Sequence, residues 1–190
     1  MILILVGESA SGKSTLAGLV EKNTNFSRIV TYTTRPPRNG ERNGVDYNFI
    51  NYAEFEKMIM ENRFIENACY REWNYGTAIN FNKEENKVVV LTPAGARAFR
   101  KYAQNHKELG LQLFVVYLEV DRRSRLIKLL ERGDDIEEAY RRSLSDVGQF
   151  DSFWREADYV LQNPSYYLSP YELYKLLEYQ IDNRLKNETI

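Results

Sequence analysis

Cysteine and histidine are nearly absent from this chain, which contains one of each among its 190 residues. The single cysteine, Cys69, cannot form an internal disulfide, and together with His106 it falls short of the ligand set of a usual zinc site. We expect both residues to be structural or incidental, with Cys69 on a strand over residues 64–70 and His106 exposed to solvent at the end of a polar helix. The composition therefore excludes a disulfide framework and the usual zinc sites.

Long apolar runs and an excess of one charge are absent as well. No stretch approaches the length needed to cross a bilayer, and the first apolar segment has neither the basic start nor the cleavage site of a signal peptide. Lys and Arg total 26 against 27 Asp and Glu, a net charge of −1, so no global positive field favours nucleic acid or an anionic membrane. We expect a cytoplasmic protein that binds neither nucleic acid nor membrane, and its oligomeric state stays open.

A glycine-rich motif follows the first apolar run. Residues 1–6 have the composition of a buried strand, and residues 7–15 read Gly-Glu-Ser-Ala-Ser-Gly-Lys-Ser-Thr, a P-loop in its strand-loop-helix context. The glycines let the backbone turn so that N–H groups point inward, and the helix that follows adds the positive end of its dipole. The predicted phosphate-binding residues are Gly7, Ser9, Ala10, Ser11, Gly12, Lys13, Ser14 and Thr15. The motif predicts a nucleoside triphosphate as ligand.

Two side chains of the motif have roles of their own. Lys13 would reach the β- and γ-phosphates, and the hydroxyl of Ser14 would ligate Mg²⁺, which leaves Thr15 to begin the helix. The alternative is a chance glycine-rich turn before a helix. The motif by itself leaves GTPase, ATPase, transporter and kinase activities open.

Apolar strands alternate with helices along most of the chain. At 190 residues with 43% hydrophobic side chains, one substantial core is expected. The expected strands cover residues 29–32, 88–91, 113–118 and 159–161, and the expected helices cover residues 94–102, 122–131, 136–150 and 171–185. Asp121 can cap the second of these helices and Gly133 can end it. The alternation predicts an α/β fold, a doubly wound parallel sheet with ligands at the carboxyl ends of its strands.

One segment breaks the alternation. Residues 33–44 read Thr-Thr-Arg-Pro-Pro-Arg-Asn-Gly-Glu-Arg-Asn-Gly, and their Pro and Gly keep them out of regular structure. A solvated linker is one interpretation. Order returns at residues 47–50 and at the helical repeat Phe55, Met58 and Ile59, which favours a loop that a ligand orders.

The motifs in and after this loop resemble the guanylate kinase family. Residues 33–49 contain the family's order of two threonines, Arg, Pro-Arg, Gly-Glu, Gly and Asp-Tyr-x-Phe, and Phe-Ile-Glu at 64–66 and Tyr-Gly-Thr at 75–77 follow. The likeness covers nearly the whole chain. It implies a P-loop kinase fold, ATP as the phosphoryl donor and Mg²⁺ as the cofactor. It also implies that Glu66 reads guanine, and that the hydroxyls of Thr31 and Thr77 contact guanine or phosphate.

The chemistry of these residues agrees with that resemblance. A nucleoside monophosphate carries a dianion, which suits permanently charged, bidentate donors such as Arg35 and Arg38. The hydroxyls of Tyr47 and Tyr75 can add hydrogen bonds, although core packing is the alternative for each tyrosine. The carboxylate of Glu66 can accept bonds from N1–H and the 2-amino group of guanine, whereas adenine offers no such pair of donors on that edge.

Two departures from the family's pattern stand out. Val90 and Thr92 occupy positions where guanylate kinases commonly have two aspartates, which affects both guanine recognition and metal organisation. Thr92 can still offer a hydroxyl to the base, and Mg²⁺ can be held by Ser14, phosphates and waters. The second departure lies in the lid, where Lys128 stands in place of the family's arginine. Lysine keeps the positive charge but lacks the paired N–H donors of a guanidinium group.

The resemblance assigns the remaining charged residues to a lid. Arg132 and Arg142 are the expected arginines for the transferring phosphoryl group, whose charge is stabilised by positioning and electrostatics. Helical spacing cannot turn both Arg141 and Arg142 inward, so Arg141 remains an alternative, as does a solvated charged helix. Asn163 lies where the family often has a residue near adenine.

The sequence thus predicts an ATP-dependent kinase for GMP and dGMP that acts by direct in-line transfer, since the acceptor phosphate is itself a nucleophile. The expected division is a core of residues 1–31, 81–121 and 146–190, a monophosphate-binding insertion over 32–80 and a lid over 122–145. Two alternatives stay open: a kinase for another phosphorylated acceptor, suggested by Val90 and Thr92, and a non-catalytic guanylate-kinase-like binding module. The intact motif at residues 12–14 argues against the second alternative.

Overall fold

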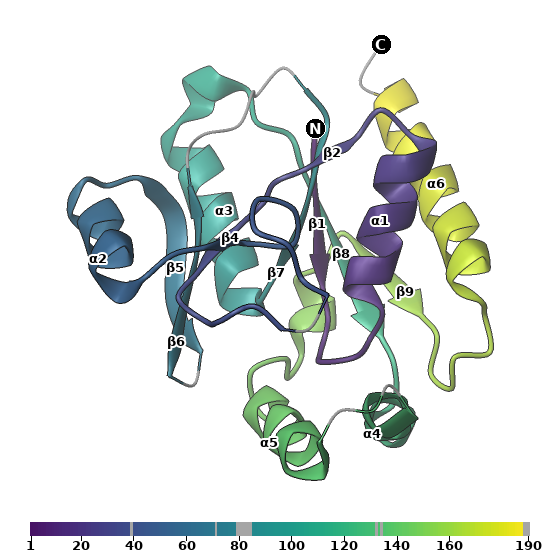
Figure 1. Ribbon diagram of the computed structural model, residues 1–190. Helices are drawn as coiled ribbons and strands as arrows, with labels where there is room; N and C mark the ends of the chain where they lie inside the picture. The colour runs from purple at the N-terminus through teal and green to yellow at the C-terminus, as the bar shows by residue number, and fades with distance from the viewer. Residues whose placement is uncertain (39, 71, 79–84, 132, 134, 188–190) are drawn as a thin grey trace.

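The helices and strands follow one another in the order that Figure 1 shows for the computed structural model, which describes residues 1–190 except 39, 71, 79–84, 132, 134 and 188–190. The helices are α1 (Lys13–Asn23), α2 (Tyr52–Met60), α3 (Pro93–Asn105), α4 (Arg122–Glu131), α5 (Ile136–Asp146) and α6 (Pro170–Asn187), with 3₁₀ turns η1 (Lys107–Leu109) and η2 (Phe153–Arg155). The strands are β1 (Ile2–Val6), β2 (Ser27–Arg28), β3 (Tyr32–Thr33), β4 (Asn48–Phe49), β5 (Phe64–Tyr70), β6 (Trp73–Ala78), β7 (Lys87–Leu91), β8 (Leu113–Glu119) and β9 (Tyr159–Gln162).

The larger sheet is built around β1. Within the described residues its strand order is β2-β7-β1-β8-β9, and the paired strands run parallel. Every residue of β1 is buried, as expected for a parallel strand covered on both faces. Figure 1 shows α1 and α6 on one face of this sheet and α3 on the other. The predicted doubly wound α/β architecture is confirmed.

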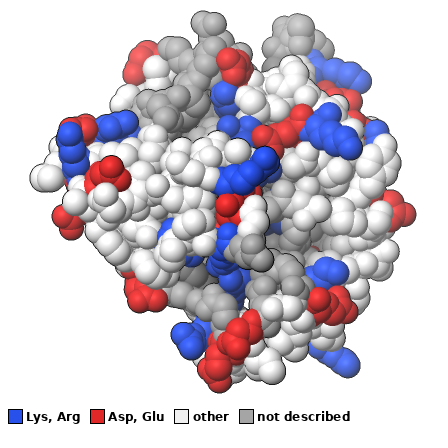
Figure 2. Space-filling view, viewed as in Figure 1, with Lys and Arg blue, Asp and Glu red and all other residues white. Residues whose placement is uncertain are grey.

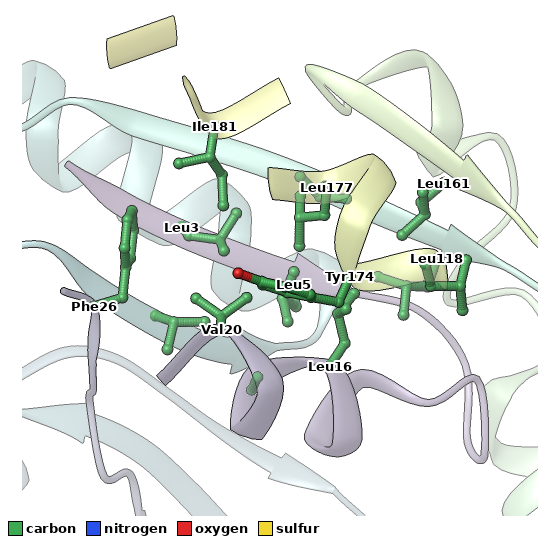
Figure 3. Close-up of a cluster of buried hydrophobic side chains, with 14 of the residues drawn as sticks. Leu3, Leu5, Leu16, Val20, Phe26, Leu118, Leu161, Tyr174, Leu177 and Ile181 are labelled. Carbon is green, nitrogen blue, oxygen red and sulfur yellow. The ribbon is translucent and has the colours of Figure 1, made fainter. Parts of the chain in front are cut away.

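Apolar side chains fill the space between this sheet and its helices. Leu3 and Leu5 of β1 pack with Leu16 of α1 and Leu177 of α6 (Figure 3). The alternate residues of β1 point to the opposite face, where Ile4 packs with Phe99 of α3 and other buried side chains. The packing on both faces fixes β1, and therefore the loop that follows it, at the centre of the molecule.

A smaller sheet has the order β4-β3-β6-β5 and lies beside α2. The β5–β6 pair is antiparallel and places Glu66 directly opposite Thr77, with a register shift between Phe64 and Glu66. The ring of Phe55 in α2 stacks on Phe64 with centroids 4.7 Å apart, which holds the helix on the sheet. The segment that breaks the alternation of strands and helices therefore forms a sheet of its own.

The strand expected over residues 29–32 is wrong. The chain instead makes β2 beside β7 and then β3 in the smaller sheet. The N–H of Ile29 still donates to Val88 O at 2.9 Å, while Thr31 O accepts from Asn48 N at 2.8 Å. The apolar run is divided because this segment carries the chain from one sheet to the other.

Several helix boundaries also differ from expectation, and α3 continues to Asn105 rather than ending at residue 102. Helix α1 begins at Lys13 rather than at Thr15, because Gly12 takes a left-handed conformation with φ of 95° and starts the helix early. Helix α5 ends at Asp146 rather than continuing to residue 150, and Gly148 follows with φ of 81°. Asp121 caps α4 as predicted, since its Oδ1 accepts from Ser124 N at 2.9 Å.

Several side chains lie elsewhere than the pattern suggested. His106 is half-buried, not exposed, because its ring stacks on Tyr102 with centroids 4.2 Å apart. Two apolar residues of the helices, Ile59 of α2 and Leu176 of α6, are 40% and 45% exposed. Cys69 is an exposed free thiol. None of the described helices is long and apolar enough to cross a membrane.

The neighbouring leucines of α6 provide a test of the core. Leu177 is fully buried and Leu176 is 45% exposed. We expect Leu177→Ala to lower the free energy of unfolding by about 2–5 kcal/mol, because it removes buried methyl groups and leaves a cavity. The matched Leu176→Ala change should stay within about 0.5 kcal/mol. Urea denaturation of both variants measures the difference, and equal losses would contradict this packing.

Candidate active site

The loop after β1 has the geometry of a phosphate cradle. A Cβ on Gly7 would lie 2.8 Å from Leu118 O and 2.6 Å from Ser11 Oγ, so only glycine fits where the loop leaves the sheet. Gly12 adopts its left-handed conformation just before α1 and makes no side-chain cap. The first N–H groups of a helix have no intrahelical acceptor and therefore point their positive ends at this loop. The backbone is thus arranged to receive an anion.

Lys13 is a half-buried cation held over this loop. Its Nζ donates to Glu8 O at 2.7 Å and to Ser11 Oγ at 3.4 Å. Burial lowers the pKa of Lys13 to about 8, while the carboxylates of Asp146 and Glu8 partly oppose that shift. A desolvated ammonium group gains most from an anionic ligand, because few waters have to leave when the ligand binds.

A pocket extends from the P-loop to the smaller sheet. It is lined by eight residues that the sequence assigned to phosphate or monophosphate binding, namely Gly7, Ser9, Lys13, Thr31, Tyr47, Glu66, Tyr75 and Thr92, and also by Val90. Thr77 is fully buried beside it and donates to Glu66 Oε1. Residues far apart in the sequence therefore line one pocket that contains the cation of Lys13 and the carboxylates of Glu66 and Asp146.

Glu66 is one of the acidic groups that line that pocket. Thr77 Oγ1 donates to Glu66 Oε1 at 2.6 Å, which fixes the orientation of the carboxyl group. Burial raises the pKa of Glu66, and the hydrogen bonds from Thr77 oppose that shift. The second oxygen lies 3.4 Å from the position that a Cβ on Gly95 would occupy, near the start of α3. Glu66 lines the pocket, where its carboxylate can accept hydrogen bonds from a ligand with N–H donors.

Thr92 has a structural role at the same pocket. It is the N-cap of α3, and its Oγ1 accepts from Gly95 N at 3.2 Å. Its hydroxyl proton can still be donated, because the cap uses the oxygen as an acceptor. Val90, half-buried on the preceding strand, contributes an apolar wall to the pocket.

Arg35 and Arg38 lie beside the pocket rather than on its lining. Arg35 is 7% exposed, and its Nη2 lies 2.9 Å from both carboxylate oxygens of Glu41. The guanidinium carbon of Arg35 is 5.5 Å from the centre of the Tyr47 ring, and that ring packs edge-on against Tyr75. Arg35 Nε is buried without a hydrogen-bond partner within the described part of the chain. The charge of Arg35 is matched by Glu41, so an anion at this guanidinium would have to compete with that carboxylate.

Positive charge is concentrated around Arg38. Its pKa is lowered by burial and then by the charges of Arg142 and Arg35. Figure 2 shows Lys and Arg side chains along the middle of this face of the molecule, with carboxylates between them. Like charges at such a site are unfavourable until an anion binds. Burial, more than the neighbouring Tyr75, also raises the pKa of Tyr47, so its hydroxyl stays a hydrogen-bond donor.

A second pocket lies on the other side of the P-loop. It is lined by the loop and the start of α1, together with Lys128, Asn163 and Tyr166. Both ends of the Asn163 amide pair with the backbone of Leu168 at 3.0 Å, so this side chain shapes the loop after β9. Tyr166, which sequence reasoning missed, donates its hydroxyl to Ala10 O at 2.6 Å. The side chain of Lys128 is 59% exposed and pairs with Glu131.

Arginines of the lid differ in their burial. Arg142 is 9% exposed and lies near Arg38, whereas Arg141 is exposed on the outer side of α5. Arg132 falls outside the described residues. Figure 1 shows α4 and α5 beyond the carboxyl ends of β1 and β8, at the same edge of the sheet as the P-loop.

Sequence reasoning also missed a set of ion pairs beneath the lid. Arg125 of α4, which is 6% exposed, pairs with Glu8 at 3.0 Å and lies 3.6 Å from Asp146. Glu8 occupies a position that the P-loop pattern leaves free, and Arg125 and Asp146 stand on helices with many charged residues. The sequence carries no signal that these three would meet.

Comparisons with known proteins agree on one family. A model of the guanylate kinase family matches residues 1–178. A guanylate kinase of Nostoc sp. is 36% identical over 152 residues, which cover 75% of this chain and 72% of that protein. A guanylate kinase of Paramagnetospirillum magneticum is 30% identical over 166 residues, with 86% and 77% covered. The crystal structure of guanylate kinase from Anaplasma phagocytophilum has the same fold, with a TM-score of 0.66 at 21% identity over 99% of this chain and 85% of that one.

The charge of Lys13 should depend on pH within a range that can be measured. With a pKa of about 8, Lys13 is protonated below that pH and neutral above it. We expect an NMR titration of ¹³C-labelled lysine to show one resonance with a midpoint near pH 8, absent in Lys13→Met. Pyrophosphate should raise the midpoint, because a bound anion favours the charged form. A midpoint near 10.5, the ordinary lysine value, would contradict the burial of this group.

Proposed function

This chain belongs to the guanylate kinase family, and we propose that it transfers the γ-phosphoryl group of ATP to GMP, giving ADP and GDP. The observation that carries this assignment is the single pocket lined by both the P-loop lysine and the half-buried carboxylate of Glu66. An acceptor whose base binds at Glu66 would direct its phosphate toward Lys13. The two reacting phosphates would then meet above the P-loop.

Glu66 gives the acceptor site its preference for guanine. Its carboxylate can accept from N1–H and the 2-amino group of the base, and Thr77 holds it in the orientation required. Adenine has no donor pair on that edge, so it would leave the buried carboxylate unsatisfied, at a cost of about 1–3 kcal/mol or more. The hydroxyls of Thr31 and Thr92 also face this pocket and can bond to the base. Nothing in this arrangement requires a ribose 2′-hydroxyl, so we include dGMP as an acceptor.

The phosphate of GMP would bind beside the base pocket. Arg35 and Arg38 supply the charge, and the hydroxyls of Tyr47 and Tyr75 supply further donors. Arg35 already holds a carboxylate, Glu41, by two close contacts of its Nη2. A phosphate dianion can replace or share that carboxylate, because it has the same charge sign and more acceptor oxygens. The unpartnered Nε of Arg35 adds a donor for it.

ATP would bind on the opposite side of the P-loop. Backbone N–H groups of residues 7–15, other than that of Ser9, which donates to Asp146, would hold its phosphates, with Lys13 between the β- and γ-groups. Lys128 and Asn163 line the adjoining pocket, where we place the ribose and adenine. Lys128 would contribute a mobile charge, and Asn163 would act through the loop that it holds to Leu168.

The residues of the P-loop fit a Mg²⁺ ion that arrives with ATP. Ser14 is exposed at the start of α1 and lines the donor pocket. Among the described residues no group of three or more His, Cys, Asp or Glu could hold a metal. Mg²⁺ commonly keeps several waters and takes few protein ligands when it binds with phosphates, so Ser14 suffices as its protein ligand. The ion would neutralise charge on the phosphate oxygens.

The lid would complete the site for transfer. Arg142 and Arg132 would stabilise the charge spread over the transferring group, while closure of α4 and α5 would exclude water. The acceptor phosphate attacks in line without a general base, so catalysis consists of positioning and charge stabilisation. We therefore divide the chain into a core (1–31, 81–121 and 146–190), a monophosphate-binding insertion (32–80) and a lid (122–145). We also propose that the protein acts in the cytoplasm.

An acceptor panel tests the function directly. Purified protein with Mg-ATP is offered GMP, dGMP, AMP, UMP, CMP, dTMP and ribose phosphate, and ADP formation is measured against a control without acceptor. Turnover with GMP and dGMP, and little with the others, is the expected result. Turnover confined to another acceptor, or none despite ATP binding, would refute the proposal.

Replacing Glu66 separates base recognition from catalysis. We expect Glu66→Gln to lower kcat/KM for GMP about 100-fold, because the amide loses the charge and turns an N–H toward the base donors. The affinity for ATP should stay unchanged, since Glu66 does not line the pocket where we place the ribose and adenine. Initial-rate kinetics and calorimetric titration with ATP provide the two measurements.

The matched control is Glu56→Gln, an exposed carboxylate on α2 outside the pocket. Its kinetics with GMP should equal those of the unchanged protein. If Glu66→Gln used GMP equally well, Glu66 would not read the base.

A further inference from the structure

The lid helix α5 is attached to the P-loop by one carboxylate. Asp146 is the last residue of α5 and is 7% exposed. Its Oδ2 accepts the N–H of Ser9 at 2.7 Å, and its Oδ1 accepts the hydroxyl of Ser9 at 3.3 Å. Ser9 precedes the N–H groups that open α1, so this contact leaves those groups to the phosphates of a ligand.

A buried arginine holds that carboxylate in place. Arg125 Nη1 lies 3.6 Å from Asp146 Oδ2, and its Nη2 donates to Glu8 Oε1 at 3.0 Å. Its Nε donates to Val120 O at 3.0 Å, which fixes the plane of the guanidinium. Tyr117 donates its hydroxyl to the other oxygen of Glu8 at 3.0 Å. The network joins β8, α4, α5 and the P-loop through charges that would be costly to leave unpaired.

Arg142 lies one helical turn before Asp146 on α5. Residues four apart share one face of a helix, so the end of α5 that Asp146 anchors also carries the guanidinium of Arg142. Arg142 is 9% exposed and near enough to Arg38 for its charge to lower the pKa of that group. The position at which Asp146 holds the end of α5 therefore determines where Arg142 lies relative to the monophosphate site.

We propose that Asp146 is a positioning residue for phosphoryl transfer: it docks α5 on Ser9, with Arg125 as its counter-ion, and thereby places Arg142 at the reacting phosphates. This inference rests on the proposed function. Asp146 acts through Arg142, so its removal affects the transition state more than the binding of either nucleotide. A carboxylate that merely occupied an empty P-loop would behave in the opposite way, because its removal would strengthen ATP binding.

A double-mutant cycle with GMP as acceptor tests this role. Asp146→Ala should lower kcat about tenfold or more, with both KM values changed less than about threefold. Asp146→Asn should recover part of the loss, because its amide oxygen can still accept from Ser9 N. In an Arg142→Ala background, Asp146→Ala should lower kcat by less than about a further twofold. The control is Asp151→Ala, an exposed carboxylate after α5 that should match the unchanged protein.

Amide hydrogen exchange gives a second readout that needs no turnover. In nucleotide-free protein the Ser9 amide should exchange faster in Asp146→Ala than in the unchanged protein or in Asp151→Ala. Equal losses of kcat in both backgrounds, or an unchanged kcat with tighter ATP binding, would overturn the positioning role. If the protein without any substitution had no GMP kinase activity, the proposed function itself would be overturned. The two failures are therefore distinguishable.

Discussion

The parallel pairing of β1 between β7 and β8 is the constraint on which the site depends. Parallel strands end at the same edge of a sheet, so the P-loop after β1, Thr92 after β7 and the lid after β8 meet there. The close approach of Gly7 to Leu118 O holds the P-loop against β8. The smaller sheet then extends the site by placing Glu66 and Thr77 opposite each other. The P-loop and Glu66 thereby line the same pocket.

The buried arginines at and near the site form ion pairs with carboxylates. Arg35 contacts Glu41, and Arg125 contacts Glu8 and lies near Asp146. Buried charges without partners would destabilise the fold, whereas these pairs keep each guanidinium in place before a nucleotide arrives. The two pairs differ in their surroundings. Arg35 lies beside the pocket that Tyr47 and Tyr75 line, whereas Arg125 is buried on α4 and pairs with Glu8 of the P-loop.

The sequence predicted those elements that depend only on residues close to one another in the chain. The P-loop, the strands of the larger sheet and the Asp121 cap follow from apolar periodicity and from glycine and capping chemistry. The strand expected at residues 29–32 failed because its pairing partners lie in two different sheets, which no local window reveals. The association of Glu8, Arg125 and Asp146 was missed for the same reason, since contacts more than a hundred residues apart depend on how α4 and α5 pack. Glu66 and Thr31 were found through the family resemblance and not through periodicity.

The central claim is that donor and acceptor sites form one continuous site across the P-loop, with GMP's phosphate directed at the γ-phosphate of ATP. A ligand in which adenosine and guanosine are joined through five phosphates tests this claim most directly, by calorimetric titration. We expect it to bind at least about a hundredfold more tightly than ATP or GMP, because one association fills both sites, and to be displaced by either nucleotide. An affinity no greater than that of the tighter single nucleotide, or displacement by one nucleotide alone, would contradict a continuous site.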